Sequence, residues 1–219
     1  MGALALGTRK ASASEAPSGP AKAPKSGGKV KMASTTKSAA IAPLAAKYAA
    51  AFGVPTSLLM ALCAIESSYN PKAQNIGPVA MAKNRGGAWG LTQLLLVTAN
   101  DATKRFPAIA KKWWPKWNGT GEGLKDPNVN LAMAAYLLSR LWTRYKARPL
   151  PWYVTGVSWN QGAGNMDKFL TRGGGKLDTA VMTSGAKEYY ARLQLQANEN
   201  PAVNQLIAVE QSSGAFRYA

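Results

Sequence analysis

The most constraining feature of the chain is an apolar run with helical spacing, Leu58 to Tyr69, in which Glu66 is the only charged residue. Leu59 and Leu62 precede Glu66 by seven and four positions, so an α-helix places all three side chains on one face. Such a face is buried in a core, where a carboxyl group loses water. Because desolvation disfavours the charged form, we expect a raised pKa for Glu66, suited to a general acid.

The simpler alternative is a glutamate on the solvated edge of an amphipathic helix. No Lys or Arg lies three or four positions from Glu66 to pair with it, and its neighbours are mainly apolar. These surroundings favour the catalytic interpretation over the solvated one.

The remaining functional groups narrow the chemistry. The chain has ten acidic residues and no histidine, which excludes Ser-His-Asp and Cys-His catalysis and metal sites that need imidazole. Cys63 is the only cysteine, so no disulfide can form within the chain, and we interpret it as a small buried apolar side chain. The glycines of residues 172–176 lack the spacing of a phosphate-binding loop and indicate a flexible connector. Carboxylate chemistry, with no cofactor and no metal, is what remains.

Helical periodicity runs from Ile41 to Gln196, and no alternating strand pattern of useful length occurs. We therefore predict a mostly α single domain over residues 41–196, with Pro43 in the first turn of its first helix. The expected helices cover residues 41–52, 55–69, 91–106, 129–145, 153–160 and 186–196, with a loop at 71–88.

The charge and the two ends suggest anionic partners. The formal net charge is +17, of which +6 lies in residues 1–40. This segment is a low-complexity basic arm, expected to be disordered or extended, and residues 197–219 are a C-terminal tail available to a partner. We find neither a signal peptide nor a membrane span. The excess of positive charge favours nucleic acid, an anionic membrane surface or acidic envelope polymers.

Four ordered blocks of sequence resemble the soluble lytic transglycosylases, which have a lysozyme-like fold. Taken together, the order and separation of these blocks are more specific than any one of them. The blocks are Ala64-Ile65-Glu66-Ser67-Ser68-Tyr69-Asn70-Pro71-Lys72-Ala73, Gly90-Leu91-Thr92-Gln93-Leu94, Asp126-Pro127-Asn128-Val129-Asn130-Leu131 with Ala134-Ala135-Tyr136-Leu137, and Trp159-Asn160-Gln161-Gly162-Ala163-Gly164-Asn165.

The resemblance implies roles for individual residues. Glu66 matches the single catalytic glutamate of the family, and Ser67 the serine after it that helps hold the site. The motif that lines the cleft opposite the glutamate, and whose glutamine contacts the sugar chain, is matched by Gly90, Leu91 and Gln93. Asn160 matches the asparagine of an Ala-Tyr-Asn segment, and Gly162 and Gly164 match its glycine turn.

The chain departs from the family pattern in two places. Trp159 stands where the family has a tyrosine, so Tyr153 or a water must replace a hydroxyl near the acid. The interval between Glu66 and Gly90 is about ten residues longer than usual, with residues 76–87 as the expected insertion. This insertion is open to interpretation as a lid, a partner contact or a segment with no function.

Two acidic and three aromatic residues have alternative interpretations as site residues or as structural residues. Asp101 is the best candidate for a second carboxylate, although a solvated helix face suits it better, and Asp126 is expected to cap the following helix. Trp159 and Trp89 are candidate stacking platforms for sugar rings, whereas Trp142 belongs to an apolar helical stripe and is expected in the core.

The resemblance implies a peptidoglycan lytic transglycosylase that cleaves the MurNAc-GlcNAc β-1,4 bond and forms a 1,6-anhydro ring. A hydrolytic muramidase on the same fold, or a structural or DNA-binding virion component, remains the alternative. The expected setting is a phage particle that opens the cell wall locally during DNA entry, acting in the host periplasm. The alternative setting is the bacterial envelope. Expected partners are peptidoglycan glycan strands, other virion proteins through the arm and the tail, and non-specific contact with DNA or an anionic envelope.

Overall fold

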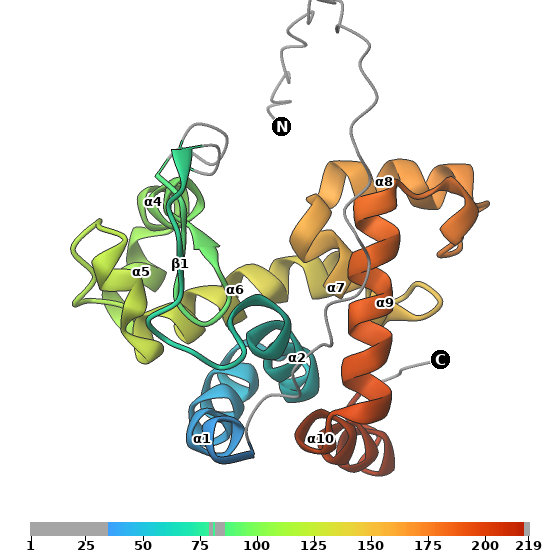
Figure 1. Cartoon of the computed structure of the whole chain (residues 1–219), viewed down its shortest axis with the longest axis horizontal. Helices are drawn as coiled ribbons and strands as arrows, with labels where there is room; N and C mark the ends of the chain where they lie inside the picture. Colours follow the sequence, from blue (N-terminus) through green and yellow to red (C-terminus); the bar gives the residue numbers. More distant parts are fainter. Residues whose placement is uncertain (1–34, 79–80, 82–85, 217–219) are drawn as a thin grey trace, which may run out of the picture. The chain divides into compact units, whose positions relative to one another are not determined.

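The computed structural model describes residues 35–78, 81 and 86–216 and confirms the prediction of a mostly α chain (Figure 1). The helices are α1 (Thr35–Phe52), α2 (Thr56–Ser67), α4 (Leu96–Arg105), α5 (Pro107–Trp113), α6 (Pro127–Tyr145), α7 (Pro151–Gln161), α8 (Ala163–Arg172), α9 (Ser184–Glu199) and α10 (Pro201–Ser212). Short 3₁₀ helices cover Glu122–Lys125 and Thr179–Val181.

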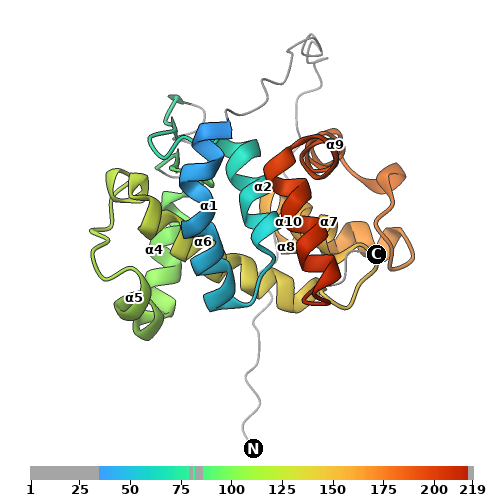
Figure 2. The ribbon, with the colours of Figure 1, turned by 90° about the horizontal axis from the view of Figure 1, so that it is seen from below.

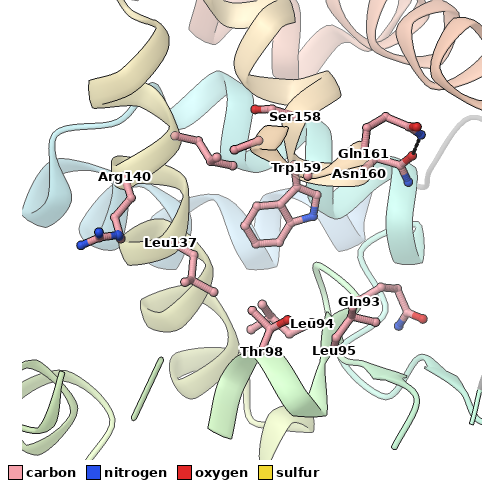
Figure 3. Close-up of a pocket in the computed structure, with 13 residues that line it drawn as sticks. Gln93, Leu94, Leu95, Thr98, Leu137, Arg140, Ser158, Trp159, Asn160 and Gln161 are labelled. Atoms are coloured by element: carbon pink, nitrogen blue, oxygen red, sulfur yellow. Dashed lines mark hydrogen bonds between the residues drawn. The ribbon is translucent and has the colours of Figure 1, made fainter. Parts of the chain in front are cut away.

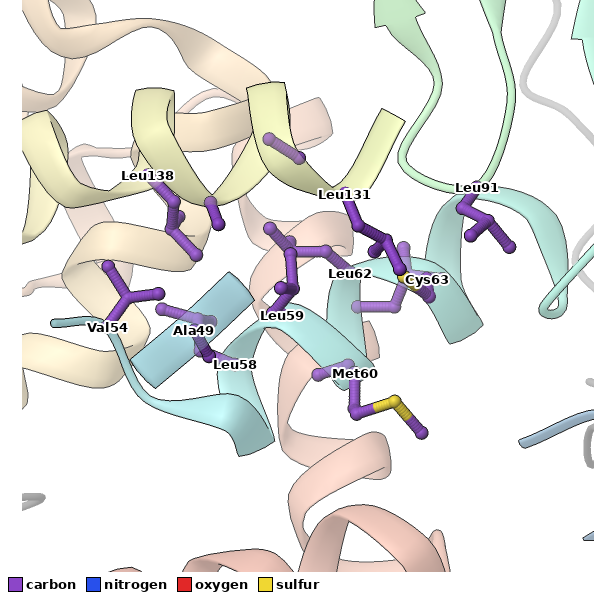
Figure 4. Close-up of a cluster of buried hydrophobic side chains, with 14 of the residues drawn as sticks. Ala49, Val54, Leu58, Leu59, Met60, Leu62, Cys63, Leu91, Leu131 and Leu138 are labelled. Carbon is purple, nitrogen blue, oxygen red and sulfur yellow. The ribbon is translucent and has the colours of Figure 1, made fainter. Parts of the chain in front are cut away.

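Helix α2 lies at the centre of the helical domain. Its residues from Ser57 to Ile65 are all buried, because α1, α7, α9 and α10 pack around it. Figure 2 shows α1, α2 and α10 side by side, and Figure 4 shows leucines of α2 facing Leu131 and Leu138 of α6. The end of α2 that carries Glu66 is therefore held by packing on several sides.

A small antiparallel sheet follows α2, a feature absent from the sequence prediction. Its strands β1 (Gln74–Asn75), β2 (Ala88–Trp89) and β3 (Leu94–Leu95) pair in the order β1-β2-β3. Two-residue strands are too short to leave an alternating pattern, and the helix expected from Leu91 begins at Leu96. The sheet brings the segment Gly90–Gln93 back toward the end of α2.

Several predicted boundaries were wrong. Helix α1 begins at Thr35, so Pro43 lies inside it, and the last six residues of the predicted arm are helical; residues 1–34 lie outside the described part. The expected flexible connector begins inside α8, a helix we did not predict. The expected C-terminal tail contains α10, which packs on α2. In the described residues, no helix is long and apolar enough to cross a membrane.

Candidate active site

Glu66 lies one residue before the end of α2, with a partly buried side chain. Burial raises the pKa of the Glu66 carboxyl group above its usual value, and a hydrogen bond from Tyr189 and the positive charge of Arg192 lower it by less. The expectation of a desolvated acid on the helix is therefore supported. A carboxyl group held in this way keeps its proton to a higher pH than an exposed glutamate does.

Tyr189 on α9 is the tyrosine that contacts Glu66. Its hydroxyl donates a hydrogen bond to Glu66 Oε1 at 2.7 Å. Burial has the largest effect on the pKa of Tyr189 and raises it well above its usual value, and the negative charge of Glu66 raises it further. The phenol therefore stays protonated and remains a donor. The structure corrects our suggestion of Tyr153, whose ring instead packs against Trp152 and Tyr190.

Arg192 lies one helical turn after Tyr189 and reaches the same end of α2. Its guanidinium donates a hydrogen bond to the carbonyl of Ile65, the residue before Glu66. Helix α9 thus contributes both a hydrogen-bond donor and a positive charge beside the candidate acid. Sequence reasoning predicted the helix but assigned neither residue to the site, because nothing local to α9 indicates which residue it meets.

Ser67 connects the end of α2 to the Gly90–Gln93 turn. Its hydroxyl oxygen lies 2.7 Å from the carbonyl oxygen of Leu91 and 3.0 Å from that of Cys63. A hydroxyl has one proton, so it donates to one carbonyl at a time. The Leu91 side chain is fully buried, and its contribution to the site is this backbone contact rather than the cleft-lining role we expected.

Gly90 is required by the geometry of this turn. Its φ is +75°, and a Cβ atom there would lie 2.2 Å from the carbonyl oxygen of Leu124 and 2.3 Å from Asn130 Nδ2. A side chain at position 90 would therefore clash with backbone as well as adopt a strained conformation. Gln93, at the other end of the turn, donates a hydrogen bond to the Gly90 carbonyl at 3.0 Å.

Asn130, on α6, holds the Gly90–Gln93 turn in place through its side-chain amide, a role that sequence analysis did not assign to it. Its Oδ1 accepts hydrogen bonds from the backbone N–H of Thr92 at 3.1 Å and from the Thr92 hydroxyl at 2.9 Å. Its Nδ2 donates to the carbonyls of Trp89 and Leu124, both at 3.0 Å. An asparagine in a buried helical stripe is the signal that could have identified this role.

A cavity of about 530 Å³ lies between the Gln93 turn, α6 and the end of α7 (Figure 3). Gln93, Trp159 and Asn160 line it, together with apolar side chains that include Leu137. Three of the expected substrate-binding residues therefore meet in one cavity, although they come from two segments more than sixty positions apart. Glu66 is not among the residues that line the cavity.

The aromatic candidates separate clearly. Trp159 faces the cavity. Trp89 does not line it: its indole N–H donates to the Gly86 carbonyl at 2.8 Å, and its ring fills the space where a side chain of Gly121 would lie. The suggestion of Trp89 as a stacking platform is thus replaced by a packing role. Trp142 is buried in the core, as predicted.

The other candidate carboxylates are engaged elsewhere. Asp101 is exposed and pairs with Arg105 at 2.8 Å, which confirms the solvated helix face. Asp126 accepts a hydrogen bond from the Asn128 backbone N–H and caps α6, as predicted. Cys63 is fully buried, and burial raises the pKa of its thiol. Within the described ranges no cluster of three or more acidic or cysteine ligands could hold a metal ion.

The chain matches the family described as "Transglycosylase SLT domain" over residues 43–182. It is also similar to the soluble lytic murein transglycosylases of Escherichia coli strains K12 and O157:H7, with 26% identity over 135 residues in each case. The aligned region covers 62% of this chain and 18% of each relative, so the chain spans less than a fifth of their length. The family match, with the helical architecture, confirms the predicted lysozyme-like fold class. The matched range includes Glu66, Gln93 and Asn160, and ends before α9.

Proposed function

Because the chain belongs to the transglycosylase SLT domain family, we propose that it is a lytic transglycosylase that cleaves the glycan strands of peptidoglycan. The observation that carries the proposal is the partly buried Glu66 carboxyl group, with its raised pKa and its hydrogen bond from Tyr189. Gln93, Trp159 and Asn160 form the proposed substrate-binding surface in the cavity between the Gln93 turn and the end of α7. Ser67, Gly90 and Leu91 support it by positioning the backbone.

Glu66 acts first as a general acid in this mechanism. Its proton goes to the glycosidic oxygen between N-acetylmuramic acid and N-acetylglucosamine, and the bond to the anomeric carbon breaks. The substrate's 2-acetamido group stabilises the positive charge at that carbon. The Glu66 carboxylate then takes the proton of the C6 hydroxyl of the same muramic acid, whose oxygen closes the 1,6-anhydro ring.

A single carboxyl group is sufficient for this reaction. A hydrolase of the two-carboxylate type needs a second acidic group about 5 to 9 Å from the first, to act as base or nucleophile. The side chains that shift the pKa of Glu66 are Tyr189 and Arg192, neither of which is a carboxylate, and Asp101 is paired with Arg105 on the surface. These observations favour transglycosylation over the hydrolytic alternative.

Product analysis in heavy-oxygen water tests the proposal. Digestion of purified peptidoglycan is expected to release muropeptides that end in unlabelled 1,6-anhydro-N-acetylmuramic acid, since the attacking oxygen comes from the substrate. Reducing ends that carry the label would show that water attacks, and the enzyme would then be a muramidase. No soluble product from wild-type protein would contradict both enzymatic assignments.

For the setting, we propose a phage particle in which the enzyme opens the cell wall locally during DNA entry. The support is the charge of +17, which suits contact with DNA or an anionic envelope, and the basic segment of residues 1–40 as an arm for other virion proteins. Detection of the chain in purified phage particles, with a wall-clearing band on a peptidoglycan gel, tests this setting. Its occurrence only in the envelope of uninfected bacteria would favour the alternative setting.

A further inference from the structure

Arg140 is the only charged residue among the described residues that line the cavity. It lies on α6, one turn after Leu137, and forms part of the same wall. In Figure 3 its guanidinium extends from α6 away from Trp159. Arg140 is exposed although it lines the cavity, so we place its charge at the rim of the cavity.

The guanidinium of Arg140 is held in place but has no carboxylate partner within the described part of the chain. It lies over the ring of Phe106 with 4.8 Å between Cζ and the ring centroid, and that ring packs edge-on against Tyr136. The ion pairs formed by described residues involve Arg105, Lys125 and Arg144. A cation–π contact uses none of the guanidinium N–H donors in a conventional hydrogen bond, so they remain available to a ligand.

The next arginine on the same helix shows the contrast. Arg144, one turn further along α6, pairs with Asp167 of α8, and Asp167 also accepts a hydrogen bond from the hydroxyl of Tyr145 at 2.9 Å. Arg144 is thus satisfied by the protein and does not line the cavity. Arg140 instead lines the cavity and has no carboxylate partner among the described residues.

We propose that Arg140 is a specificity-determining residue that binds a carboxylate of the stem peptide attached to the glycan. This inference rests on the proposed function. The N-acetylated sugars of the strand are neutral, and the stem peptides carry negatively charged carboxylates. A group at the rim suits a branch that leaves the cavity better than it suits the sugar chain within. A guanidinium fork matches a carboxylate through two parallel hydrogen bonds.

The test compares two substrates: soluble, uncross-linked peptidoglycan strands, and the same strands whose peptide carboxylates have been converted to neutral amides. For Arg140→Gln we expect a KM about fivefold higher on the native strands, near the upper end for an exposed ion pair, with kcat little changed. On the amidated strands the variant and the wild type are expected to have equal KM. Arg140→Lys, which keeps the charge, should retain part of the preference for native strands.

Arg144→Gln is the matched control, because it removes the same charge from the same helix but outside the cavity. It should leave the preference of the wild type for native strands unchanged. If Arg140→Gln raises KM by the same factor on both substrates, Arg140 acts through its packing on Phe106, and the proposal is overturned. If the wild type cleaves neither substrate, the proposed function itself is contradicted.

Discussion

The hydroxyl of Tyr189 donates a hydrogen bond to Glu66 Oε1 at 2.7 Å, across 123 positions of sequence. The bond joins the end of α2 to the middle of α9, two helices that pack directly against each other. Because the donor favours the charged carboxylate, it moderates the effect of burial on the pKa of Glu66. The candidate acid is therefore tuned by a helix that lies beyond the family match.

Replacement of Tyr189 by phenylalanine should shift the pH dependence of cleavage. Without the donor the pKa of Glu66 rises further, so the general acid stays protonated to a higher pH. The alkaline limb of the kcat/KM profile is then expected to move to higher pH, as measured by turbidity loss of a peptidoglycan suspension. Tyr190→Phe is the matched control and should leave the profile in place. A Tyr189→Phe profile that overlays the wild type would argue against coupling of the two groups.

Glu66→Gln is expected to abolish activity and, at neutral pH, to increase the stability of the fold. The amide cannot donate and recover a proton, so we expect turnover to fall by at least about 100-fold, the lower end for a general acid. The raised pKa means that the folded state favours protonated Glu66. Its contribution to stability is therefore complete below the unfolded-state pKa and is lost as the pH rises through the folded-state pKa.

The thermal midpoint of Glu66→Gln is accordingly expected to exceed that of the wild type at neutral pH, and the difference should shrink toward pH 4. Thermal unfolding followed by circular dichroism across this range measures it. Retention of more than a few per cent of wild-type turnover would rule out Glu66 as the acid. A midpoint below that of the wild type at neutral pH would contradict the desolvated state of the carboxyl group.

The local pattern of α2 was sufficient to predict the helix and to select Glu66, because the apolar residues around it repeat with the helical period. The cavity residues Gln93 and Asn160 came from the family resemblance, since nothing in either segment specifies that they meet. Tyr189 was missed for the same physical reason: its contact depends on the angle at which α9 crosses α2. Tyr153 was suggested because the family tyrosine is replaced by Trp159, but its ring packs against Trp152 and Tyr190.

Helix α10 was missed although the sequence carries local signals for it: Asn200 caps the helix, Pro201 follows, and Val203, Leu206 and Ile207 repeat with the helical period. The short strands, in contrast, leave no local signal. Strands of two residues are stabilised by their pairing in the sheet, not by the alternation of their side chains. Features of this kind require knowledge of neighbouring elements, which a single sequence does not supply.

Asn130→Ala should destabilise the fold and disturb the Gly90–Gln93 turn together. The change removes four hydrogen bonds, three of them buried, and each buried group left without a partner costs about 1 to 3 kcal/mol, so we expect a loss of at least about 3 kcal/mol in urea unfolding. Asn130→Asp keeps the acceptor oxygen, but a second oxygen replaces the N–H donor that faces the carbonyls of Trp89 and Leu124. We therefore expect this variant to be destabilised as well. The exposed Asn198→Ala is the control, expected within about 0.5 kcal/mol of the wild type.

Glu210→Ala is expected to destabilise the chain, because Glu210 of α10 caps the start of α2. The capped residue, Ser57, lies 153 positions before Glu210 in the sequence. Glu210 is buried, and its carboxylate accepts hydrogen bonds from the Ser57 backbone N–H at 3.1 Å and from the Ser57 hydroxyl at 2.6 Å. The hydroxyl also accepts a hydrogen bond from the indole N–H of Trp152 at 2.9 Å. Since Pro55 provides no side-chain cap for α2, the carboxylate satisfies one of the free N–H groups at the start of the helix.

The expected loss for Glu210→Ala is at least about 2 kcal/mol in the free energy of unfolding, because a buried N–H and a buried hydroxyl lose an acceptor. Glu210→Gln keeps one acceptor oxygen without the charge, so its free energy of unfolding should lie between those of the wild type and Glu210→Ala. Glu199→Ala, an exposed glutamate at the end of α9, is the matched control and should change stability by no more than about 0.5 kcal/mol. Equal stability of Glu210→Ala and Glu199→Ala would show that α10 does not hold the helix that carries Glu66.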